Sequence, residues 1–428
     1  MNLKINKNFK NKLENIDIFN PYIFIILILA FIVVAIPSLY FSGELPSPSF
    51  QVYICILIGI LLFIIGVKFP DIIIRFSKSF KNRINDLKRI NTGKSSSSKL
   101  FDYSTSKSEL LKFFKSLEFI IVAIVSIGII LQITNFLILG GIPLFSGVLK
   151  AKTATKIWLF SYIFFLIGIN VLLSKYNRKI YYLLLIIGLG LFTLTGYRTT
   201  PIAILLSVFI TLYYSKNMKI RYQIMFTCLI AILLIAIGFV AVQAIEWQSW
   251  RLNALELISY RAGFTLNILD RSLPLAGSSH GNLFYYTLTG FFKSVDPRVI
   301  VGEIVLGDNQ SITSTIFGPA ILDFSWIGMS IQMFLIGFIL KLLHMIQKHI
   351  KGIATALYGI MLGQTIIWIE TGPTDLVVWL FYLLGIIAII YYIYNIDGVA
   401  SVSGKNQNYN SDIDNEGVNG NGIDIGGD

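Results

Sequence analysis

Long apolar runs constrain this chain more than any other feature of its sequence. The hydrocarbon core of a bilayer is about 30 Å thick, and a helix needs roughly 17–25 apolar residues to cross it. In lipid, such runs can span only as helices, because every backbone N–H and C=O must be paired within the protein. The sequence therefore predicts an all-α fold, a polytopic transmembrane helical bundle with about ten spans. We expect the spans at residues 21–40, 51–67, 117–139, 157–174, 180–196, 200–214, 223–246, 317–340, 353–370 and 374–395.

The distribution of charge predicts the topology. Only 14% of the residues are charged, whereas about a quarter are charged in a typical soluble domain. The net charge of +12 comes from Lys and Arg in short segments between apolar runs, which indicates cytoplasmic loops rather than a nucleic-acid-binding face. These basic segments are the N-terminus, residues 68–116, 175–179, 216–221 and 341–351. We therefore expect a multi-pass protein of the cell (plasma) membrane, with both termini in the cytoplasm and the lipid bilayer as a partner.

The segments outside the spans differ in length and composition. Residues 1–20 are expected to form a cytoplasmic N-terminus, and residues 21–395 the integral membrane domain. Within that domain, the basic cytoplasmic loop 68–116 contains a polar, Ser-rich stretch at 83–99 that predicts disorder. The tail 396–428 is rich in Asn, Gly and Asp and predicts a disordered cytoplasmic segment.

Residues 247–316 form the one large extracellular loop that the pattern predicts. The loop contains apolar stretches that are each too short to span, so we expect short amphipathic helices at the outer membrane surface. The two cysteines, Cys55 and Cys228, lie within apolar runs. We therefore expect them to pack against neighbouring helices rather than to form a disulfide or a metal site.

The choice of arginine over lysine on the outer side is the sharpest functional signal. The chain has 25 Lys and 10 Arg, yet five of the ten arginines face outward in this topology. Guanidinium groups bind phosphate and carboxylate through two parallel hydrogen bonds, which an ammonium group cannot do. The pattern favours a site for a phosphate or pyrophosphate, and the alternative is that these arginines bind lipid headgroups or pair with loop acids. The five outward arginines are Arg198, Arg251, Arg261, Arg271 and Arg298.

Three of these arginines recur at intervals of ten residues. On one continuous helix each interval turns the side chain by about 80°, so Arg251 and Arg271 would point in nearly opposite directions. Arg251, Arg261 and Arg271 can line one site together only if the helix breaks, for which Gly263 is the expected position.

Arg198 occupies a different setting, in the sequence LTGYRTTPIA between two short apolar runs. Helices of about 15–17 residues reach only about 22–26 Å, so the tip of this hairpin should be recessed to the level of the outer headgroups. Gly196 and Pro201 supply the turn and the first turn of the next helix. A cation at that depth predicts either a functional site or a side chain that extends to lipid phosphate.

The candidates for proton transfer are fewer. His280 is the only histidine expected on the outer side and could act as a general base, with Asp270, Asp296, Asp308 and Asp323 as acidic alternatives. His344 and His349 are expected to be solvated on the cytoplasmic side. The first outer loop, FSGELPSPSF, has one acid, and no His/Asp/Glu metal cluster or nucleotide-binding motif occurs, so we expect no metal site and no cofactor.

Three short strings resemble the oligosaccharide repeat unit polymerase family, the Wzy-type O-antigen polymerases with their archaeal branch. Residues 140–145, GGIPLF, are similar to a Gly-Gly-x-Pro motif after the third span, and residues 196–198, GYR, to a Gly-x-Arg element. Residues 312–328, ITSTIFGPAILDFSWIG, resemble the stretch that opens the span after the large outer loop. The family pattern there reads acid–Phe–Gly, whereas this chain has Asp323, Phe324 and then Ser325.

The resemblance implies a metal-independent glycosyltransferase that joins lipid-linked oligosaccharide units at the outer membrane face. A growing glycan would pass from its polyprenyl pyrophosphate carrier to a sugar hydroxyl of the next unit. By this analogy Arg198 and Arg261 would contact the pyrophosphate, with the other outward arginines as further candidates. His280 would be the base and Asp323 a positioning residue. A polyprenyl-pyrophosphate-linked oligosaccharide is then the expected partner, and a flippase and a chain-length regulator are further candidates.

Three other functions remain open from the sequence. A flippase or transporter for the same lipid-linked glycan would also need outward arginines, although more spans, internal repeats and buried charges are typical of it. A ligase that transfers finished glycan to another acceptor shares the spans, the large loop and the arginine chemistry. A membrane scaffold without catalysis is the third alternative.

Overall fold

The computed structural model describes residues 17–41, 45–91, 107–216, 225, 228, 232, 254–293, 295–349, 351–374, 383 and 385–387. The chain divides into two compact units, Met1–Gly385 and Ile386–Asp428. The first unit contains nearly all of the described residues, and every contact discussed below lies within it. The described residues form helices and connecting loops without a strand.

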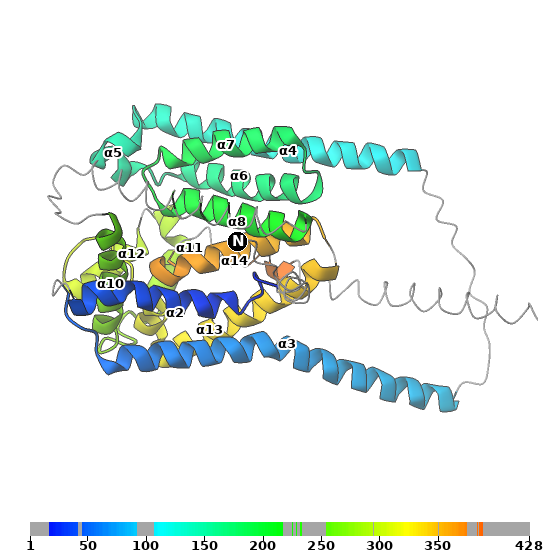
Figure 1. Ribbon diagram of the computed structural model, residues 1–428, viewed down its shortest axis with the longest axis horizontal. Coiled ribbons are helices and arrows are strands. Elements are labelled where there is room, and N and C mark those ends of the chain that lie inside the picture. Colours follow the sequence, from blue (N-terminus) through cyan, green and yellow to red (C-terminus); the bar gives the residue numbers. More distant parts are fainter. Residues whose placement is uncertain are drawn as a thin grey trace, which may run out of the picture. The chain divides into compact units, whose positions relative to one another are not determined.

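Figure 1 shows the order of the helices along the chain. The first half contains α2 (Ile23–Ile36), the π-helical turn η1 (Pro37–Phe41), α3 (Phe50–Asn91), α4 (Lys107–Leu139), the 3-10 turn η2 (Pro143–Phe145), α5 (Gly147–Lys152), α6 (Lys156–Lys175), α7 (Lys179–Thr193) and α8 (Thr199–Lys216). The second half contains α10 (Ala254–Ser272), α11 (Asn282–Lys293), α12 (Pro297–Leu306), α13 (Gly318–His349) and α14 (Ile353–Thr371).

Seven helices among the described residues are long and apolar enough to cross a membrane. They confirm the predicted all-α, polytopic fold, and the shorter apolar helix α7 coincides with an eighth expected span. The expected spans at 223–246 and 374–395 lie almost entirely outside the described residues, so the count of ten stays a prediction. The seven segments are Ile23–Phe41, Phe50–Ile73, Leu117–Leu139, Lys156–Lys175, Thr199–Lys216, Gly318–Lys348 and Ile353–Thr371.

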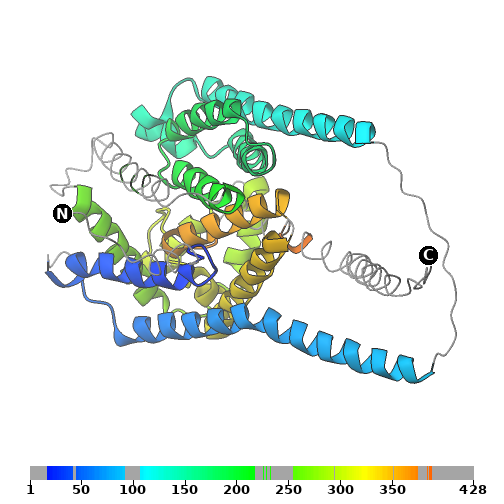
Figure 2. The same cartoon turned by 45° about the vertical axis from the view of Figure 1, so that its right-hand side comes forward.

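Three helix pairs form most of the bundle: α3 with α13, α4 with α6, and α8 with α14 (Figures 1 and 2). Glycine permits the closest of these approaches. A Cβ atom on Gly66 of α3 would collide with the carbonyl of Phe334 in α13, and one on Gly337 of α13 would collide with the carbonyl of Phe63. Small residues at such crossings are typical of helix packing in lipid, where association depends on close van der Waals contact.

Interhelical hydrogen bonds add to this packing. Asn170 on α6 is fully buried; its Nδ2 donates to Ser207 Oγ at 3.1 Å, and its Oδ1 accepts from Thr211 Oγ1 at 2.8 Å, both on α8. Because no water reaches such positions, each polar side chain there needs a partner within the bundle.

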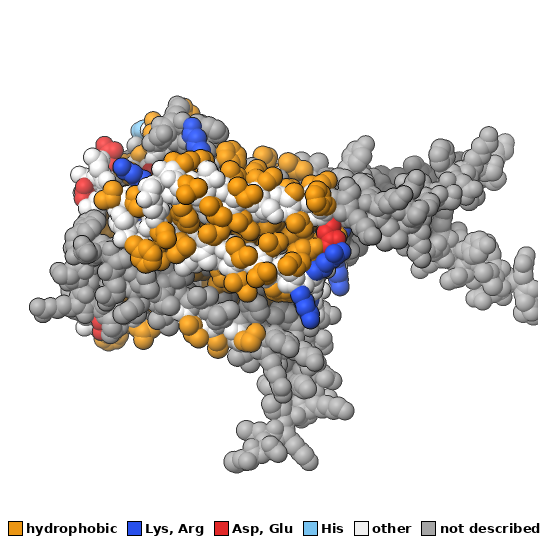
Figure 3. Space-filling view, turned by 90° about the horizontal axis from the view of Figure 1, so that it is seen from above, with side chains coloured by type: hydrophobic (Ala, Val, Ile, Leu, Met, Phe, Trp, Pro, Cys, Tyr) orange, Lys and Arg blue, Asp and Glu red, His pale blue; other side chains and the backbone are white. Residues whose placement is uncertain are grey.

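The surface has the distribution expected for a membrane protein. Figure 3 shows a broad apolar band with charged side chains gathered at its two ends. Helix α14, with 19 residues, separates the two ends by about 28 Å at 1.5 Å per residue. At its start, the carbonyl of Gly352 accepts a hydrogen bond from Ser174 Oγ at 2.5 Å, next to the predicted cytoplasmic segment 175–179. At its other end lies Glu370, among residues predicted to face outward. Which end faces the cytoplasm stays a prediction.

Two expectations about the predicted cytoplasmic side are wrong. Residues 83–91 are the last part of helix α3 rather than disordered, because no Gly or Pro occurs there before Gly93 to end the helix. Residues 92–106 lie outside the described residues.

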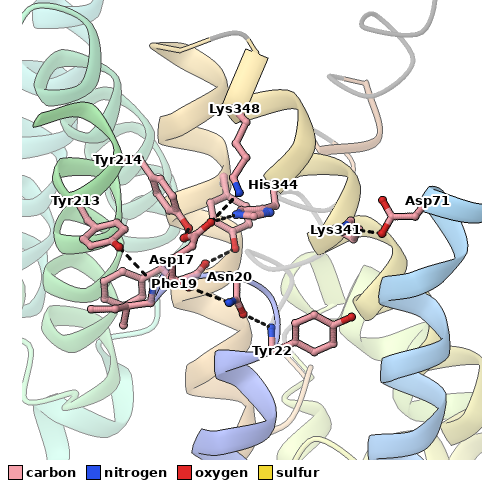
Figure 4. Close-up of polar contacts among 12 residues, drawn as sticks. Asp17, Phe19, Asn20, Tyr22, Asp71, Tyr213, Tyr214, Lys341, His344 and Lys348 are labelled. Atoms are coloured by element: carbon pink, nitrogen blue, oxygen red, sulfur yellow. Dashed lines mark hydrogen bonds and ion pairs between the residues drawn. The ribbon is translucent and has the colours of Figure 1, made fainter. Parts of the chain in front are cut away.

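His344 is buried, with 5% of its surface exposed, rather than solvated. Its Nε2 lies 2.9 Å from Oδ2 of Asp17, which also accepts from Lys348 Nζ at 2.8 Å, while Tyr214 donates to Oδ1 at 2.6 Å (Figure 4). Asp17 is 327 residues away in the chain, so the sequence around His344 could not indicate this partner. The side chain of His349 lies outside the described residues.

The predicted large outer loop contains the helices α10, α11 and α12, which fits the expected short helices. Helix α10 packs on α2 and η1, where the Ser38 backbone N–H donates to Ser259 Oγ at 3.1 Å. It continues without a break through Gly263, where a Cβ atom would collide with Ser38 Oγ. The break that would be needed for Arg251, Arg261 and Arg271 to line one site therefore does not occur at Gly263.

Candidate functional site

The tip of the α7–α8 hairpin is built on a glycine turn. Gly196 has φ +75°, a left-handed conformation that L side chains rarely adopt. A Cβ atom at this position would lie 3.5 Å from the Cα of Leu144 and 3.4 Å from the Cδ of Lys150. The Leu144 backbone N–H donates to the carbonyl of Leu194 at 2.9 Å. The GGIPLF and GYR motifs, about 50 residues apart, therefore meet at this tip.

The short helix α5 is held over the tip. Ser146 accepts a hydrogen bond from the Leu149 N–H at 3.4 Å and so caps the start of the helix. Tyr197, next to Arg198, donates through its hydroxyl to the carbonyl of Lys150 at 3.2 Å. This contact fixes the position of Lys150 relative to the loop that carries Arg198.

Three cationic side chains from three separate segments gather here: Lys150, Arg198 and Arg261. Burial lowers the pKa of Lys150 from its usual value, and the positive charges of Arg198 and Arg261 lower it further. Burial also lowers the pKa of Arg198, and Arg261 adds to this effect while Glu370 opposes it. The three side chains are therefore close enough to repel one another.

One carboxylate accompanies the three cations. Glu370 Oε1 lies 3.2 Å from the Nε of Arg261, and both side chains are partly exposed, at 39% and 41%. Three cations and one carboxylate give this group, which we call the cation cluster, a net charge of +2 (3 − 1). Such a surplus at the edge of the apolar band is unfavourable in the free protein and is neutralised by a bound dianion.

Helix geometry adds to the positive potential. Arg198 immediately precedes α8, so it lies at the positive end of that helix's macrodipole. A cation is unfavourable at this end, whereas an anion is favoured by both the helix and the side chain. The arrangement is suited to hold phosphate groups.

Two of the other arginines that were expected to face outward, Arg271 and Arg298, lie apart from the cluster. Arg271 is exposed in the last turn of α10, about 80° around the helix from Arg261. Arg298 is bound to Asp296, whose Oδ1 and Oδ2 accept from its Nε at 3.0 Å and its Nη2 at 2.9 Å. Burial by itself would raise the pKa of Asp296, but Arg298 and the hydrogen bonds that the carboxylate accepts outweigh it and hold that pKa below its usual value. Arg251 lies outside the described residues.

Asp323 has a role in the fold. It is 5% exposed, and its oxygens accept from the backbone N–H groups of Leu283 at 2.9 Å and Phe284 at 2.6 Å, as well as from the Ser279 hydroxyl. These contacts cap the start of α11 and attach it to α13. The predicted role of Asp323 in positioning the reacting groups stays a prediction, and no contact places Asp323 at the cation cluster within the described residues.

His280 lies beside this cap, in the turn between α10 and α11. Its φ is +49°, its side chain is exposed, and its backbone N–H donates to Gly277 at 3.2 Å. Its role as a general base stays a prediction.

Sequence reasoning missed two members of the cluster, Lys150 and Glu370. The sequence did contain a signal for Lys150, because this residue lies in the expected outer segment 140–156. Lysines are usually concentrated in cytoplasmic segments instead. Glu370 ends an apolar run, IIWIE, which by itself indicates only the end of a span. Among the described His, Cys, Asp and Glu side chains, no group of three or more could hold a metal ion.

Comparison with known proteins supports the resemblance. A family model described as "Putative O-antigen polymerase" matches residues 17–382. An uncharacterised protein of Methanocaldococcus jannaschii is 27% identical over 271 residues, which are 62% of this chain and 75% of the relative. A second uncharacterised protein of that organism is 27% identical over 263 residues, 61% of this chain and 62% of the relative. The match therefore spans less than two thirds of the second relative, and no solved structure matches the chain.

Proposed function

The chain belongs to the O-antigen polymerase family, and from this premise we propose that it is a glycosyltransferase that polymerises lipid-linked oligosaccharide units at the outer face of the plasma membrane. Membership of the family makes it a multi-pass membrane protein of polysaccharide biosynthesis. The donor would be a glycan on a polyprenyl pyrophosphate carrier, and the acceptor a sugar hydroxyl of the next lipid-linked unit.

The observation that carries this proposal is the convergence of Lys150, Arg198 and Arg261 at one end of the bundle. A pyrophosphate that links a lipid to a sugar carries two negative charges, which match the cluster's net charge of +2. The cluster lies where the apolar spans end, at the level where a lipid-linked pyrophosphate would be held. Guanidinium groups from two segments would bind its oxygens through paired hydrogen bonds.

The cluster would accelerate transfer by stabilising the leaving group. The acceptor oxygen forms a bond to the anomeric carbon of the donor sugar, while the bond between that carbon and the pyrophosphate oxygen breaks. The electron pair leaves with the carrier pyrophosphate, whose negative charge increases, and preorganised cations stabilise that charge most where it develops. A base must take the hydroxyl proton, and His280 is the candidate that the family resemblance implies.

We further propose that this chemistry does not require a metal ion, because the cations would supply the charge stabilisation. The topology that follows from the Lys-rich segments would put both termini in the cytoplasm and the cation cluster outside. A flippase would deliver the units, and a chain-length regulator is a further candidate partner.

The test is elongation by the purified protein. In detergent or liposomes it should convert lipid-linked oligosaccharide, extracted from cells that lack this protein, into a ladder of longer lipid-linked glycans, with or without EDTA. Complete loss with EDTA and recovery with Mg²⁺ or Mn²⁺ would refute metal independence. In a deletion strain, single surface units support a polymerase, whereas an absence of surface glycan supports a flippase.

A further inference from the structure

Glu370 lies in an unfavourable place for a carboxylate. It is in the last turn of α14, at the negative end of the helix macrodipole, and this turn contains no basic residue. The chain is fixed immediately afterwards: Gly372 has φ +72°, and a Cβ atom there would lie 2.6 Å from the carbonyl of Thr315. Glu370 is thus presented from a rigid backbone at the edge of the cation cluster.

The ion pair with Arg261 is weak enough to exchange. Both side chains are about 40% exposed, so water and salt screen the pair and it contributes little to stability. The contact engages the Nε of Arg261, one of the donors that a phosphate would use. A pyrophosphate brings two charges to the same cluster and therefore outcompetes a single side-chain carboxylate.

The negative charge of Glu370 acts on Arg198 as well as on Arg261, with which it forms the ion pair. A pyrophosphate bound by the two arginines would therefore lie near this carboxylate.

From this geometry we propose that Glu370 is the general base of elongation, held by Arg261 in the free protein and released when the donor pyrophosphate takes over Arg261. This inference rests on the proposed polymerase function. The released carboxylate accepts the proton of the acceptor hydroxyl as the hydroxyl oxygen bonds to the anomeric carbon. The sugar–pyrophosphate bond breaks, its electron pair leaves with the carrier, and Glu370 then returns its proton to water.

Binding of the donor pyrophosphate to Arg261 releases Glu370, so the base becomes available when the donor is present. Departure of the pyrophosphate restores the pair with Arg261 and returns the site to its starting state. The other sequence candidates fit this role less well. Both oxygens of Asp323 are occupied by the start of α11, and the imidazole of His280 has no hydrogen bond within the described part of the chain.

The decisive variant is Glu370→Gln, because glutamine can still accept a hydrogen bond from Arg261 but cannot take a proton. General-base catalysis contributes typically 10²–10⁴-fold, so the elongation rate should fall by about that factor. Binding of farnesyl pyrophosphate, measured by titration of the detergent-purified protein, should be unchanged or tighter, since no carboxylate competes for Arg261. Glu370→Asp, which keeps the carboxylate on a shorter side chain, should recover part of the rate.

The matched control is Glu303→Gln, an exposed glutamate on α12, which should elongate like wild type. Wild-type elongation rates for Glu370→Gln would overturn the inference. Parallel loss of farnesyl pyrophosphate binding and elongation would also overturn it, because Glu370 would then only position Arg261. If the wild-type protein itself fails to elongate, the proposed function fails instead.

Discussion

Replacing Arg198 with lysine distinguishes between two roles of this residue: binding of a phosphate group, or mere extension of the side chain to the lipid headgroups. The substitution keeps the charge and most of the length but removes the planar pair of N–H donors. Arg198 is half-buried next to Lys150 and Arg261, so a phosphate bound there is partly desolvated. Losing one charge-assisted contact in such a site costs about 2–4 kcal/mol, or roughly 30- to 1000-fold in rate. A snorkelling arginine should lose no more than about 1 kcal/mol.

The assay is the elongation rate in vitro and the glycan length in vivo, with the amount of membrane-inserted protein measured for each variant. Arg178→Lys is the matched control, because Arg178 pairs with Glu118 at the opposite end of the bundle. A companion variant, Arg198→Met, removes a charge that Arg261 and Lys150 repel, so the thermal midpoint of the unliganded protein should stay equal or rise while elongation is lost. Normal polymerisation by Arg198→Lys would refute the claim that the arginine fork binds pyrophosphate.

Three further predictions concern topology and stability. After Cys228→Ser, an impermeant thiol reagent applied from outside should label a Ser278→Cys variant but not a Ser97→Cys variant; the opposite pattern would reverse the proposed sidedness. Ser325 has φ 58° and ψ −159°, a backbone conformation that almost only glycine adopts and that costs another residue about 1–3 kcal/mol. Ser325→Gly should therefore raise the thermal midpoint, and a lower midpoint would contradict strain at this site. Burial by itself would raise the pKa of Asp17, but its hydrogen bonds outweigh burial and hold that pKa well below its usual value. The contribution of the Asp17 carboxylate to the free energy of unfolding is therefore complete above its unfolded pKa of about 4, and it is lost as the pH falls below that value. At neutral pH, Asp17→Asn should cost about 2 kcal/mol in thermal unfolding in detergent, because Lys348 loses its carboxylate partner. A wild-type midpoint would contradict that role.

The helices and their order could be predicted because the signal is local. A run of apolar residues long enough to cross a bilayer has to be helical, whatever it packs against. The same local reasoning placed Arg198 on a glycine turn at the end of two short spans, where the structure has it. The structure accounts for the glycine of the family pattern at the position of Ser325, since the backbone there has the conformation that a glycine adopts without strain, and it offers no explanation for the serine.

The partners of the charged residues could not be predicted, because they come from distant segments. Arg261 and Glu370 are 109 residues apart, and His344 and Asp17 are 327 residues apart. Each of the four appeared in the sequence as a residue at a span end or in a loop. Only the packing of α10 beside the end of α14, and of the segment before α2 beside α13, brings each pair together. The ten-residue spacing predicted that Arg251, Arg261 and Arg271 cannot all line one site on an unbroken helix, and α10 runs unbroken from Arg261 to Arg271.

The cation cluster places its charges where the helices disfavour them. Arg198 lies at the positive end of α8, Glu370 lies at the negative end of α14, and Lys150 and Arg261 repel Arg198. Each placement lowers the stability of the free protein, whereas at the opposite end of the bundle Lys341 Nζ lies 2.9 Å from an oxygen of the oppositely charged Asp71. In the proposed reaction, a bound pyrophosphate would offset the unfavourable placement of all three cations. The free energy that these placements cost the free protein would then contribute to binding, and it would contribute more as negative charge accumulates on the departing carrier.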